Sequence, residues 1–186
     1  MYKFAPAGEN EPIVFGAARP GYLTQKVDNW IEFMKQQDVK RVCCLLPEKQ
    51  LVNYSVNLIN RYEQEFGNLQ VCWAPIEDFH LCDLKTLTTK ILPFLIAADK
   101  QGEKVVVHCS GGIGRTGHVL AAWLVSVRGL SNKAAIKAVK RTGRNPSEAA
   151  IASVFTGRNP FKVVKELDSL LNNCRITIGA DEDKQF

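Results

Sequence analysis

The chain has 186 residues, of which 46% are hydrophobic and 23% charged, and it carries a net charge of +5. This length and balance predict one soluble globular domain with a core of its own. The longest uncharged apolar run, residues 118–127, is too short to cross a bilayer, and no apolar secretory segment follows Lys3. We therefore expect a cytoplasmic protein without integral membrane association.

The same features bound the cysteine chemistry and the domain organisation. Without export, the cysteines are expected to be free thiols, and none are paired at zinc-finger spacing, so no metal is expected. These cysteines are Cys43, Cys44, Cys72, Cys82, Cys109 and Cys174. We predict a single domain over residues 1–186, with its core at about 10–173 and an acidic tail at 174–186 that is mobile at its end.

Strand-like and helix-like segments alternate along the chain, which predicts an α/β fold with a central, mostly parallel sheet flanked by helices. In the first half we expect strands at residues 13–18, 39–46 and 69–75. A first helix is expected to be capped by Thr24, and a second to cover residues 51–66 and end near Gly67. The first helix places apolar residues at helical spacing, namely Val27, Trp30, Ile31 and Met34.

The second half begins with a helix predicted over residues 84–98, which Pro93 is expected to bend. A strand at 104–108 then leads through a glycine-rich loop into a helix at 115–128. Further helices are expected at residues 131–140, 148–155 and about 160–173. The sequence Thr-Gly-Arg-Asn-Pro occurs at 142–146 and again at 156–160, and each copy is interpreted as a helix stop followed by a turn.

The glycine-rich loop is the most informative feature, because residues 108–117 read His-Cys-Ser-Gly-Gly-Ile-Gly-Arg-Thr-Gly. A strand end and a helix N-terminus converge there, which directs backbone N–H groups and the helix dipole at the loop interior. Five residues separate Cys109 from Arg115, so a tight curl brings both side chains to one centre. The positive surroundings favour a nucleophilic thiolate, and the arginine offers a planar fork for two oxygens. These residues predict a site for a phosphate dianion.

Three other interpretations of this loop are less favoured. Gly112-x-Gly114-x-x-Gly117 satisfies the dinucleotide-binding fingerprint, but residues 104–147 contain no Asp or Glu to bind the ribose. A nucleotide P-loop requires lysine before the threonine, where Arg115 stands. A buried structural cysteine in a glycine turn explains neither the arginine nor the start of a helix.

The run resembles the signature of the cysteine-based protein phosphatases, His-Cys-x5-Arg-Thr/Ser, and Gly117 matches as well. The resemblance is to the small dual-specificity and tyrosine phosphatases and implies their fold. It also implies that Cys109 attacks phosphorus, that Arg115 and the loop amides hold the phosphoryl group, and that Thr116 steadies the departing thiolate. The implied substrate-binding residues are Ser110, Gly111, Gly112, Ile113, Gly114 and Arg115. No cofactor and no metal is implied.

Such an enzyme also needs a general acid to protonate the leaving oxygen. In the resembling phosphatases this acid is an aspartate on a loop upstream of the cysteine, often after a proline and an apolar residue. Pro75-Ile76-Glu77-Asp78 is similar, so Asp78 is the expected acid, with Asp83 and then Glu77 as alternatives. Asp83 also suits a helix N-cap. The family often has a proline a few positions after the acid, where this chain has Leu81-Cys82, so the shape of the loop stays open.

The expected substrate is a phosphorylated protein, with phosphotyrosine first and phosphoserine or phosphothreonine as further targets. Phosphoinositides or other small phosphomonoesters are the alternative, although the loop interior has no lysine, unlike the phosphoinositide phosphatases. A phosphate-binding pseudo-phosphatase is a second alternative, against which the presence of Cys109, Arg115 and Asp78 argues. Nucleic acid is not expected because no aromatic residues are interleaved with the basic ones. The oligomeric state stays open.

Two further hypotheses concern residues around the loop. Basic residues are concentrated in the acid-free stretch, where they are expected to attract an anionic substrate or to form a solvated helix face. They are Lys104, Arg115, Arg128, Lys133, Lys137, Lys140, Arg141 and Arg144, and Arg144 is a candidate for substrate contact. A second thiol, Cys43, Cys44 or Cys72, could form a disulfide with Cys109 on oxidation, although buried core positions explain all three.

Overall fold

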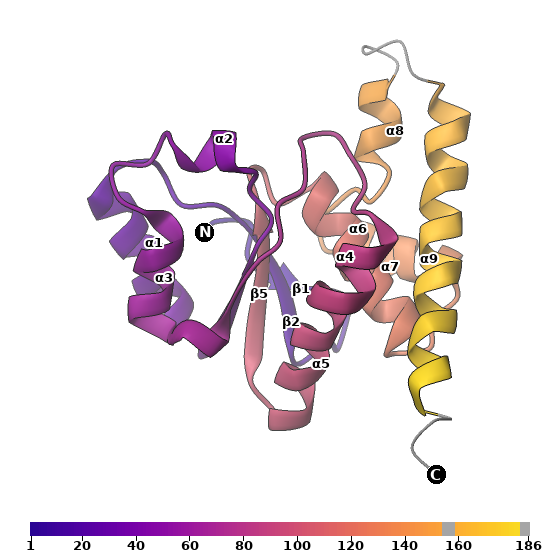
Figure 1. Ribbon diagram of the computed structural model, residues 1–186, viewed down its shortest axis with the longest axis horizontal. Helices are drawn as coiled ribbons and strands as arrows, with labels where there is room; N and C mark the ends of the chain where they lie inside the picture. Colours follow the sequence, from indigo (N-terminus) through magenta and orange to yellow (C-terminus); the bar gives the residue numbers. More distant parts are fainter. Residues whose placement is uncertain (154–158, 183–186) are drawn as a thin grey trace.

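The computed structural model describes residues 1–153 and 159–182, which fold into a sheet between two layers of helices (Figure 1). Across the sheet the strand order is β1-β2-β5-β3-β4, and only β1 runs antiparallel to its neighbour. The strands are β1 (Ala5–Pro6), β2 (Val14–Ala18), β3 (Val39–Cys44), β4 (Val71–Trp73) and β5 (Lys104–Cys109). The predicted α/β fold with a mostly parallel sheet is therefore confirmed.

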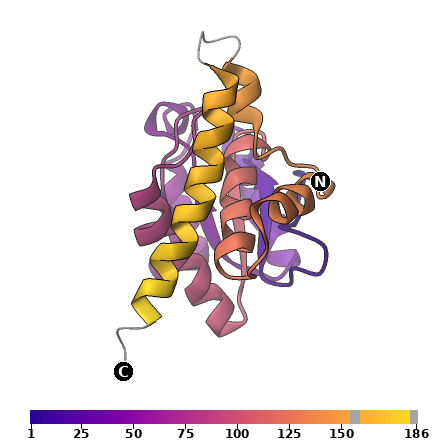
Figure 2. The same ribbon diagram turned by 90° about the vertical axis from the view of Figure 1, so that its right-hand side faces the viewer.

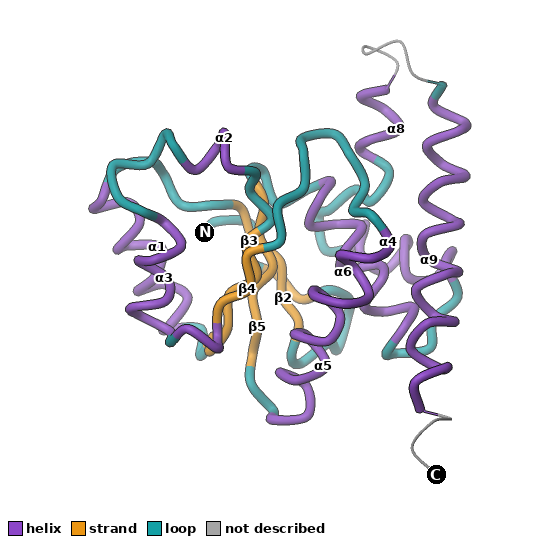
Figure 3. The backbone as a smooth tube through the Cα atoms, in the orientation of Figure 1, coloured by secondary structure: helices purple, strands orange, loops and turns teal. Residues whose placement is uncertain are grey.

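Helices cover both faces of the sheet (Figure 3). On one face lie α1 (Thr24–Gln36) and α3 (Leu58–Phe66), and the short α2 (Glu48–Leu51) precedes α3 in the chain. On the other face lie α4 (Leu84–Thr86), the π-helical turn η2 (Leu87–Ile91), α5 (Leu92–Gln101), α6 (Gly114–Ser126), α7 (Asn132–Arg141), α8 (Glu148–Ser153) and α9 (Pro160–Glu182). A 3-10 turn, η1 (Asn68–Gln70), leads into β4.

The central strand β5 is apolar because it is buried on both faces, as parallel strands between helices are. Val105 and Val107 pack into the core under α5 and α6, together with Cys109. Val106 faces the opposite way, into the core under α1 and α3. Full burial of such a side chain stabilises the fold by about 1.5–3 kcal/mol. This two-sided packing fixes the carboxyl end of β5, where Cys109 lies.

The predicted helix at residues 51–66 is wrong in its first half. The chain forms α2, leaves it through an irregular segment, and starts α3 only after Asn57, whose side chain accepts a hydrogen bond from the Asn60 N–H. A local cap thus begins a new helix where apolar spacing alone predicted a continuous one. Tyr54 lies in the irregular segment and is buried against the sheet.

The predicted helix at 84–98 extends to Gln101 and contains the π-helical turn directly before Pro93. Proline lacks an N–H group and cannot continue the α-helical hydrogen-bond ladder, so a local irregularity is the expected response. Asp83 caps this helix, with its side chain accepting from the Thr86 N–H at 2.8 Å. The N-cap interpretation of Asp83 is therefore confirmed.

Other boundaries differ from the sequence predictions. Thr24 is the first residue of α1 and does not cap it; its hydroxyl hydrogen-bonds to that of Ser55. The predicted strand at 69–75 shortens to β4, and β1 was not predicted. The last two residues of the predicted helix at 148–155, and most of the second Thr-Gly-Arg-Asn-Pro copy, lie outside the described residues.

The helix predicted at about 160–173 is longer in the structure, where α9 runs from Pro160 to Glu182. Figure 2 shows α9 running lengthwise along the layer formed by α6 and α7. Leu167, Leu171 and Cys174 bury its inner face in the main core. None of the described helices is both long and apolar enough to cross a membrane.

Candidate active site

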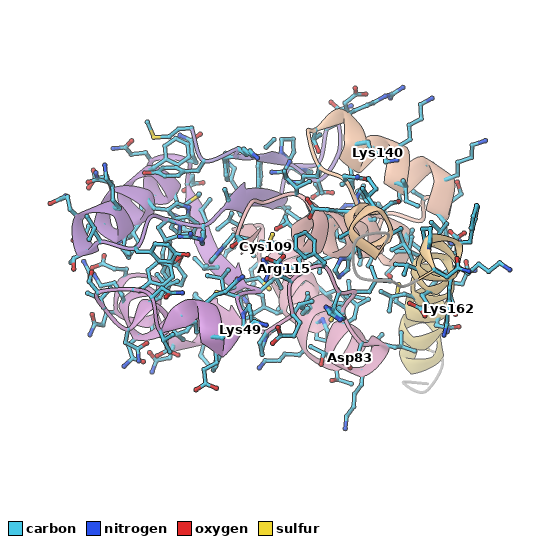
Figure 4. The ribbon with its side chains drawn as sticks, turned by 90° about the horizontal axis from the view of Figure 1, so that it is seen from above. Lys49, Asp83, Cys109, Arg115, Lys140 and Lys162 are labelled. Atoms are coloured by element: carbon cyan, nitrogen blue, oxygen red, sulfur yellow. The ribbon has the colours of Figure 1, made fainter. Side chains whose placement is uncertain are left out.

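The glycine-rich loop joins β5 to α6 at the carboxyl edge of the sheet, and Cys109 and Arg115 lie near the middle of the molecule when that edge is viewed from above (Figure 4). The Cys109 side chain is almost fully buried. The backbone N–H of Arg19 donates to the Cys109 carbonyl at 3.0 Å, which ties the start of the loop to the end of β2. The first turn of α6 leaves N–H groups without intrahelical acceptors, and they are available to an anion in the loop.

Two glycines of the loop stand where any side chain would collide. Gly112 has a φ of +68°, and a Cβ there would lie 2.5 Å from the carbonyl carbon and oxygen of Ala17. A Cβ at Gly114 would lie 2.1 Å from a carboxylate oxygen of Glu148. Backbone atoms of β2 cannot move aside as a flexible side chain can. The glycines therefore allow the tight curl and the close approach of neighbouring chain segments.

His108 precedes the cysteine but faces the opposite core. Its ring lies edge-on to Trp30 and Tyr62, at centroid distances of 5.2 Å and 5.7 Å. Burial lowers the pKa of His108 to about 3, because a charged imidazolium would lose its hydration there. The histidine is therefore neutral at physiological pH and acts as a packing residue that fixes the end of β5 before Cys109.

Arg115, in the first turn of α6, directs its guanidinium out of the helix toward the upstream loop. One terminal nitrogen, Nη1, donates to the Ile76 carbonyl at 3.1 Å and to the Gln50 side-chain oxygen at 3.2 Å. The other, Nη2, forms an ion pair with Asp78 at 3.1 Å. The side chain is only 3% exposed. Its fork thus reaches two chain segments that are far from it in sequence.

Of the three carboxylates considered as the general acid, Asp78 is the one that the structure places against Arg115. Its second oxygen accepts from the Gln50 amide at 3.4 Å, and its side chain is 39% exposed. Glu77 instead pairs with Lys49 and is 53% exposed. Asp83 is engaged in its helix cap, and the hydrogen bonds from Thr86 lower its pKa. Of the three, only Asp78 therefore pairs with Arg115, and its role as the general acid stays a prediction.

The Thr116 hydroxyl is buried and has no hydrogen-bond partner among the described residues. Threonine at this position follows Arg115 directly, in the first turn of α6. A buried hydroxyl without a partner is costly unless a ligand or a reacting group uses it. Its burial beside the loop is compatible with the role expected from the sequence.

Gln50 is a site residue that sequence reasoning missed. It hydrogen-bonds both to Arg115 and to Asp78, so it bridges the two charged groups. It lies in α2, close to the point where the sequence predicted an unbroken helix. Neither its residue type nor its spacing from the loop distinguishes it from an exposed helical glutamine. Only the fold of residues 44–58 over the carboxyl edge of the sheet brings it to the site.

Arg144 is buried and makes structural contacts, and the hypothesis that it touches a substrate stays a prediction. Its side chain is buried and donates to the carbonyls of Thr142 at 2.7 Å, Lys3 at 2.7 Å and Gly16. Burial lowers its pKa to about 10. The guanidinium thus joins the N-terminal segment and β2 to the chain after α7. A Cβ on Gly16 would lie 2.4 Å from the Arg144 Nε, so glycine makes room for this bridge.

The other basic residues do not gather at the mouth of the loop. Lys104 begins β5 and Arg128 follows α6, so both lie at the opposite end of these elements from Cys109. Arg128 forms ion pairs with Glu11 at 2.9 Å and with Asp99 at 2.6 Å. Lys140, on α7, lies at the rim of the molecule in Figure 4. The expected positive charge around the loop is therefore wrong for Lys104 and Arg128, whereas the exposed Lys140 agrees with the alternative of a solvated helix face.

The candidate partner thiols are all buried. Cys43 and Cys72 are paired in register on neighbouring strands, and the hydrogen bond with the Cys72 thiol, together with burial, raises the pKa of Cys43. Burial raises the pKa of Cys44 to about 12, so this thiol stays protonated at physiological pH. These features agree with core positions. A disulfide with Cys109 stays a prediction.

Comparisons with known proteins identify the family. Residues 22–153 match the model of the dual specificity phosphatase catalytic domain. The chain is 30% identical over 91 residues to dual specificity protein phosphatase 1-A of Xenopus laevis, covering 49% of this chain and 24% of that protein. It is also 30% identical over 74 residues to dual specificity protein phosphatase OPG106 of vaccinia virus, covering 39% and 43%. The chain thus spans less than half the length of these curated relatives.

Solved structures agree with this assignment. The structure of Tk-PTP in its active form superposes with a TM-score of 0.61 at 28% identity, covering 84% of this chain and 92% of that one. Kinase associated phosphatase with its catalytic cysteine replaced by serine has a TM-score of 0.67 at 21% identity, covering 87% and 86%, and supports the fold alone. Because the family match covers more than half of the chain, the protein belongs to the dual specificity phosphatase catalytic domain family.

Proposed function

We propose that the protein is a cysteine-dependent phosphomonoesterase that acts on phosphotyrosine and also on phosphoserine or phosphothreonine of proteins. The observation that carries this proposal is the convergence of three groups at one sheet edge. Cys109 ends β5, Arg115 lies in the first turn of α6, and Asp78 lies 3.1 Å from Arg115. A nucleophile, an anion-binding fork and a carboxylic acid are the groups that phosphate ester hydrolysis through a covalent intermediate requires.

In the first step the Cys109 thiolate attacks phosphorus in line with the leaving oxygen. A phosphorus–sulfur bond forms, the phosphorus–oxygen ester bond breaks, and Asp78 gives its proton to the departing oxygen. Arg115 turns its fork from Asp78 and the Ile76 carbonyl to two phosphoryl oxygens. Negative charge builds on these oxygens in the transition state, so fixed donors stabilise that state more than the bound ester.

In the second step water hydrolyses the phosphocysteine. Asp78, now a carboxylate, accepts a proton from the water as its oxygen bonds to phosphorus. The phosphorus–sulfur bond breaks, and the electron pair returns to sulfur as a thiolate. The buried Thr116 hydroxyl donates to this sulfur and makes it a better leaving group. Asp78 thus gives one proton in the first step and regains one in the second.

The proposed activity implies a partner, and the free cysteines imply a location. The partner is a phosphorylated protein, and the location is the cytoplasm, where free thiols persist. A protein substrate is favoured over a phosphoinositide, because the loop interior at 110–114 has no lysine. Turnover is favoured over simple phosphate capture, because the cysteine, the arginine and the acid are all present and converge.

Steady-state hydrolysis of p-nitrophenyl phosphate across pH, with and without a chelator, tests the proposal. The wild type is expected to turn over without metal, Cys109→Ser to be inactive, and Asp78→Ala to lose the basic limb of its pH profile. Cys174→Ser and Asp83→Asn serve as matched controls, because one is a buried thiol on α9 and the other a helix cap. Phosphate binding without turnover by the wild type would instead support a phosphate-binding protein.

A further inference from the structure

The loop that carries Asp78 is held to α6 by a histidine. His118 lies one turn after Arg115 in α6, so both side chains leave the helix on neighbouring faces. Its Nε2 accepts a hydrogen bond from the backbone N–H of Cys82 at 3.0 Å. Cys82 is four residues after Asp78, in the segment where the related phosphatases often have a proline. A side-chain contact thus anchors a segment that proline would otherwise stiffen.

The charge state of His118 suits this contact. The side chain is 1% exposed, and burial lowers its pKa to about 4. A neutral imidazole has one acceptor nitrogen and one donor. Because Nε2 accepts from Cys82, the proton lies on Nδ1, and the ring also hydrogen-bonds to the backbone of Gly114. The ring therefore lies between the glycine-rich loop and the loop that carries Asp78, the acid loop.

Arg115 and His118, both on α6, contact the loop that carries Asp78. Binding of substrate affects the two contacts differently. Arg115 contacts the Ile76 carbonyl and Asp78, in the place where a phosphoryl group would bind. Those contacts must break when Arg115 takes up the phosphoryl oxygens. The His118 contact to Cys82 lies on the other side of Asp78 in the chain and involves no charged group. It can persist through the reaction.

We propose that His118 is a positioning residue that sets the location of Asp78 relative to the phosphate-binding loop while Arg115 holds substrate. The proposal rests on the proposed function of Asp78 as general acid. His118 touches neither substrate nor the reacting atoms. It acts through the backbone of residues 78–82, whose far end it fixes on the helix that also carries Arg115.

A displaced general acid has a signature that a weakened fold lacks. Phenyl phosphate releases a phenol with a pKa of about 10, like that of tyrosine, so its leaving oxygen needs a proton in the transition state. p-Nitrophenyl phosphate releases a much more acidic phenol and depends less on the acid. Loss of the anchor should therefore slow the first ester much more than the second, whereas general destabilisation slows both alike.

The experiment compares kcat/KM on the two esters, which reports the phosphorylation of Cys109 and not the later hydrolysis common to both. The variants are His118→Leu, which removes the acceptor, and His118→Gln, whose side-chain oxygen reaches the position of Nε2. Val119→Ala, a buried neighbour on the same helix, is the control for packing loss. We expect His118→Leu to lose about tenfold or more on phenyl phosphate and less than about threefold on p-nitrophenyl phosphate. The glutamine should restore most of the difference, and Asp78→Ala with His118→Leu should be no slower than Asp78→Ala alone.

Equal losses on both esters, or the same selective loss in Val119→Ala, would overturn the inference. Amide hydrogen exchange of Cys82 keeps the test independent of turnover and of any one variant. Exchange should be at least about tenfold faster in His118→Leu than in the wild type and near the wild-type rate in His118→Gln. Unchanged Cys82 exchange in a folded His118→Leu contradicts the anchor. If Asp78→Ala slows neither ester, that result contradicts the proposed function of Asp78 instead.

Discussion

The guanidinium of Arg115 and the carboxylate of Asp78 form an ion pair at 3.1 Å, and Gln50 hydrogen-bonds to both groups. The proposed phosphate-binding group and the proposed acid therefore neutralise each other in the structure. A phosphoryl group that binds Arg115 must compete with Asp78 for it. Binding of substrate and release of the acid are thus coupled through one side chain, and the residues around this pair should affect both.

Gln50→Glu should weaken phosphate binding, because a carboxylate at this position would pair with Arg115 and repel an anion. We expect the inhibition constant of inorganic phosphate or vanadate to rise about tenfold, which corresponds to about 1.4 kcal/mol. Asn53→Asp adds the same charge nearby on an exposed residue whose side chain contacts the Lys49 carbonyl. An equal increase in Asn53→Asp would mean that the general field and not the contact with Arg115 is responsible.

Gly112→Ala should destroy the phosphate-binding loop. Its φ of +68° strains any side chain, and the new Cβ would lie 2.5 Å from the Ala17 backbone. Gly102 is the matched comparison, since its φ is +66° and nothing lies within 4 Å of a Cβ there. Gly102→Ala should cost about 1 kcal/mol of stability and leave kcat unchanged, whereas Gly112→Ala should lower kcat/KM by about 100-fold or more. Similar activity in both variants would contradict the tight curl.

Arg144→Gln should lower stability without changing substrate binding. It removes a buried cation that donates to the carbonyls of Lys3, Gly16 and Thr142. We expect the free energy of unfolding to fall by about 2–4 kcal/mol in urea titrations, because three carbonyls, that of Gly16 buried, lose a charged donor. KM for p-nitrophenyl phosphate should change by less than about twofold. A large rise in KM with unchanged stability would return Arg144 to the substrate site.

Two buried histidines should make the fold sensitive to mild acid. Burial lowers the pKa of His108 to about 3 and that of His118 to about 4, from an ordinary value of 6.5. As the pH falls below about 6.5, the unfolded chain takes up protons that the folded chain does not, so stability present above that pH is lost. Each histidine should cost about 2 kcal/mol between pH 7 and pH 5.

Urea unfolding of the wild type and of His118→Gln at these two pH values checks this expectation. The variant retains only His108 of the pair, so its stability should fall about half as much. Equal pH dependence in His118→Gln and the wild type would show that His118 is charged in the folded protein or accessible to water.

Sequence patterns predicted the sheet well because its strands carry strong local signals. The apolar run at 105–107, between a polar start and the glycine-rich loop, specifies a strand buried on both faces. The interruption after α2 was not predictable from apolar spacing, since Asn57 caps α3 while Tyr54 and Leu58 keep the helical pattern of buried positions. The extent of α9 was also missed, because the residues after Asn173 show little apolar pattern in the sequence.

Within the site, the sequence identified the residues that belong to short motifs. Cys109 and Arg115 both belong to the run at residues 108–117, and Asp78 ends the run Pro75-Ile76-Glu77-Asp78. Gln50 lies far from the loop in sequence. His118 lies close to Arg115 in sequence, but its role depends on a contact with the distant Cys82, so neither role follows from sequence spacing. The sequence offered Arg144 as a candidate for substrate contact, but it could not show the contacts that the guanidinium makes with the carbonyls of Lys3 and Gly16.

The measurement that tests the central proposal most directly is a search for phosphorus on sulfur. The wild type, mixed with excess p-nitrophenyl phosphate and denatured within one turnover, is digested and analysed by mass spectrometry. We predict a phosphoryl group on the peptide that contains Cys109, present in the wild type and absent in Cys109→Ser. A phosphoryl group on another residue, or steady turnover by Cys109→Ser, would contradict the proposal that Cys109 is the nucleophile.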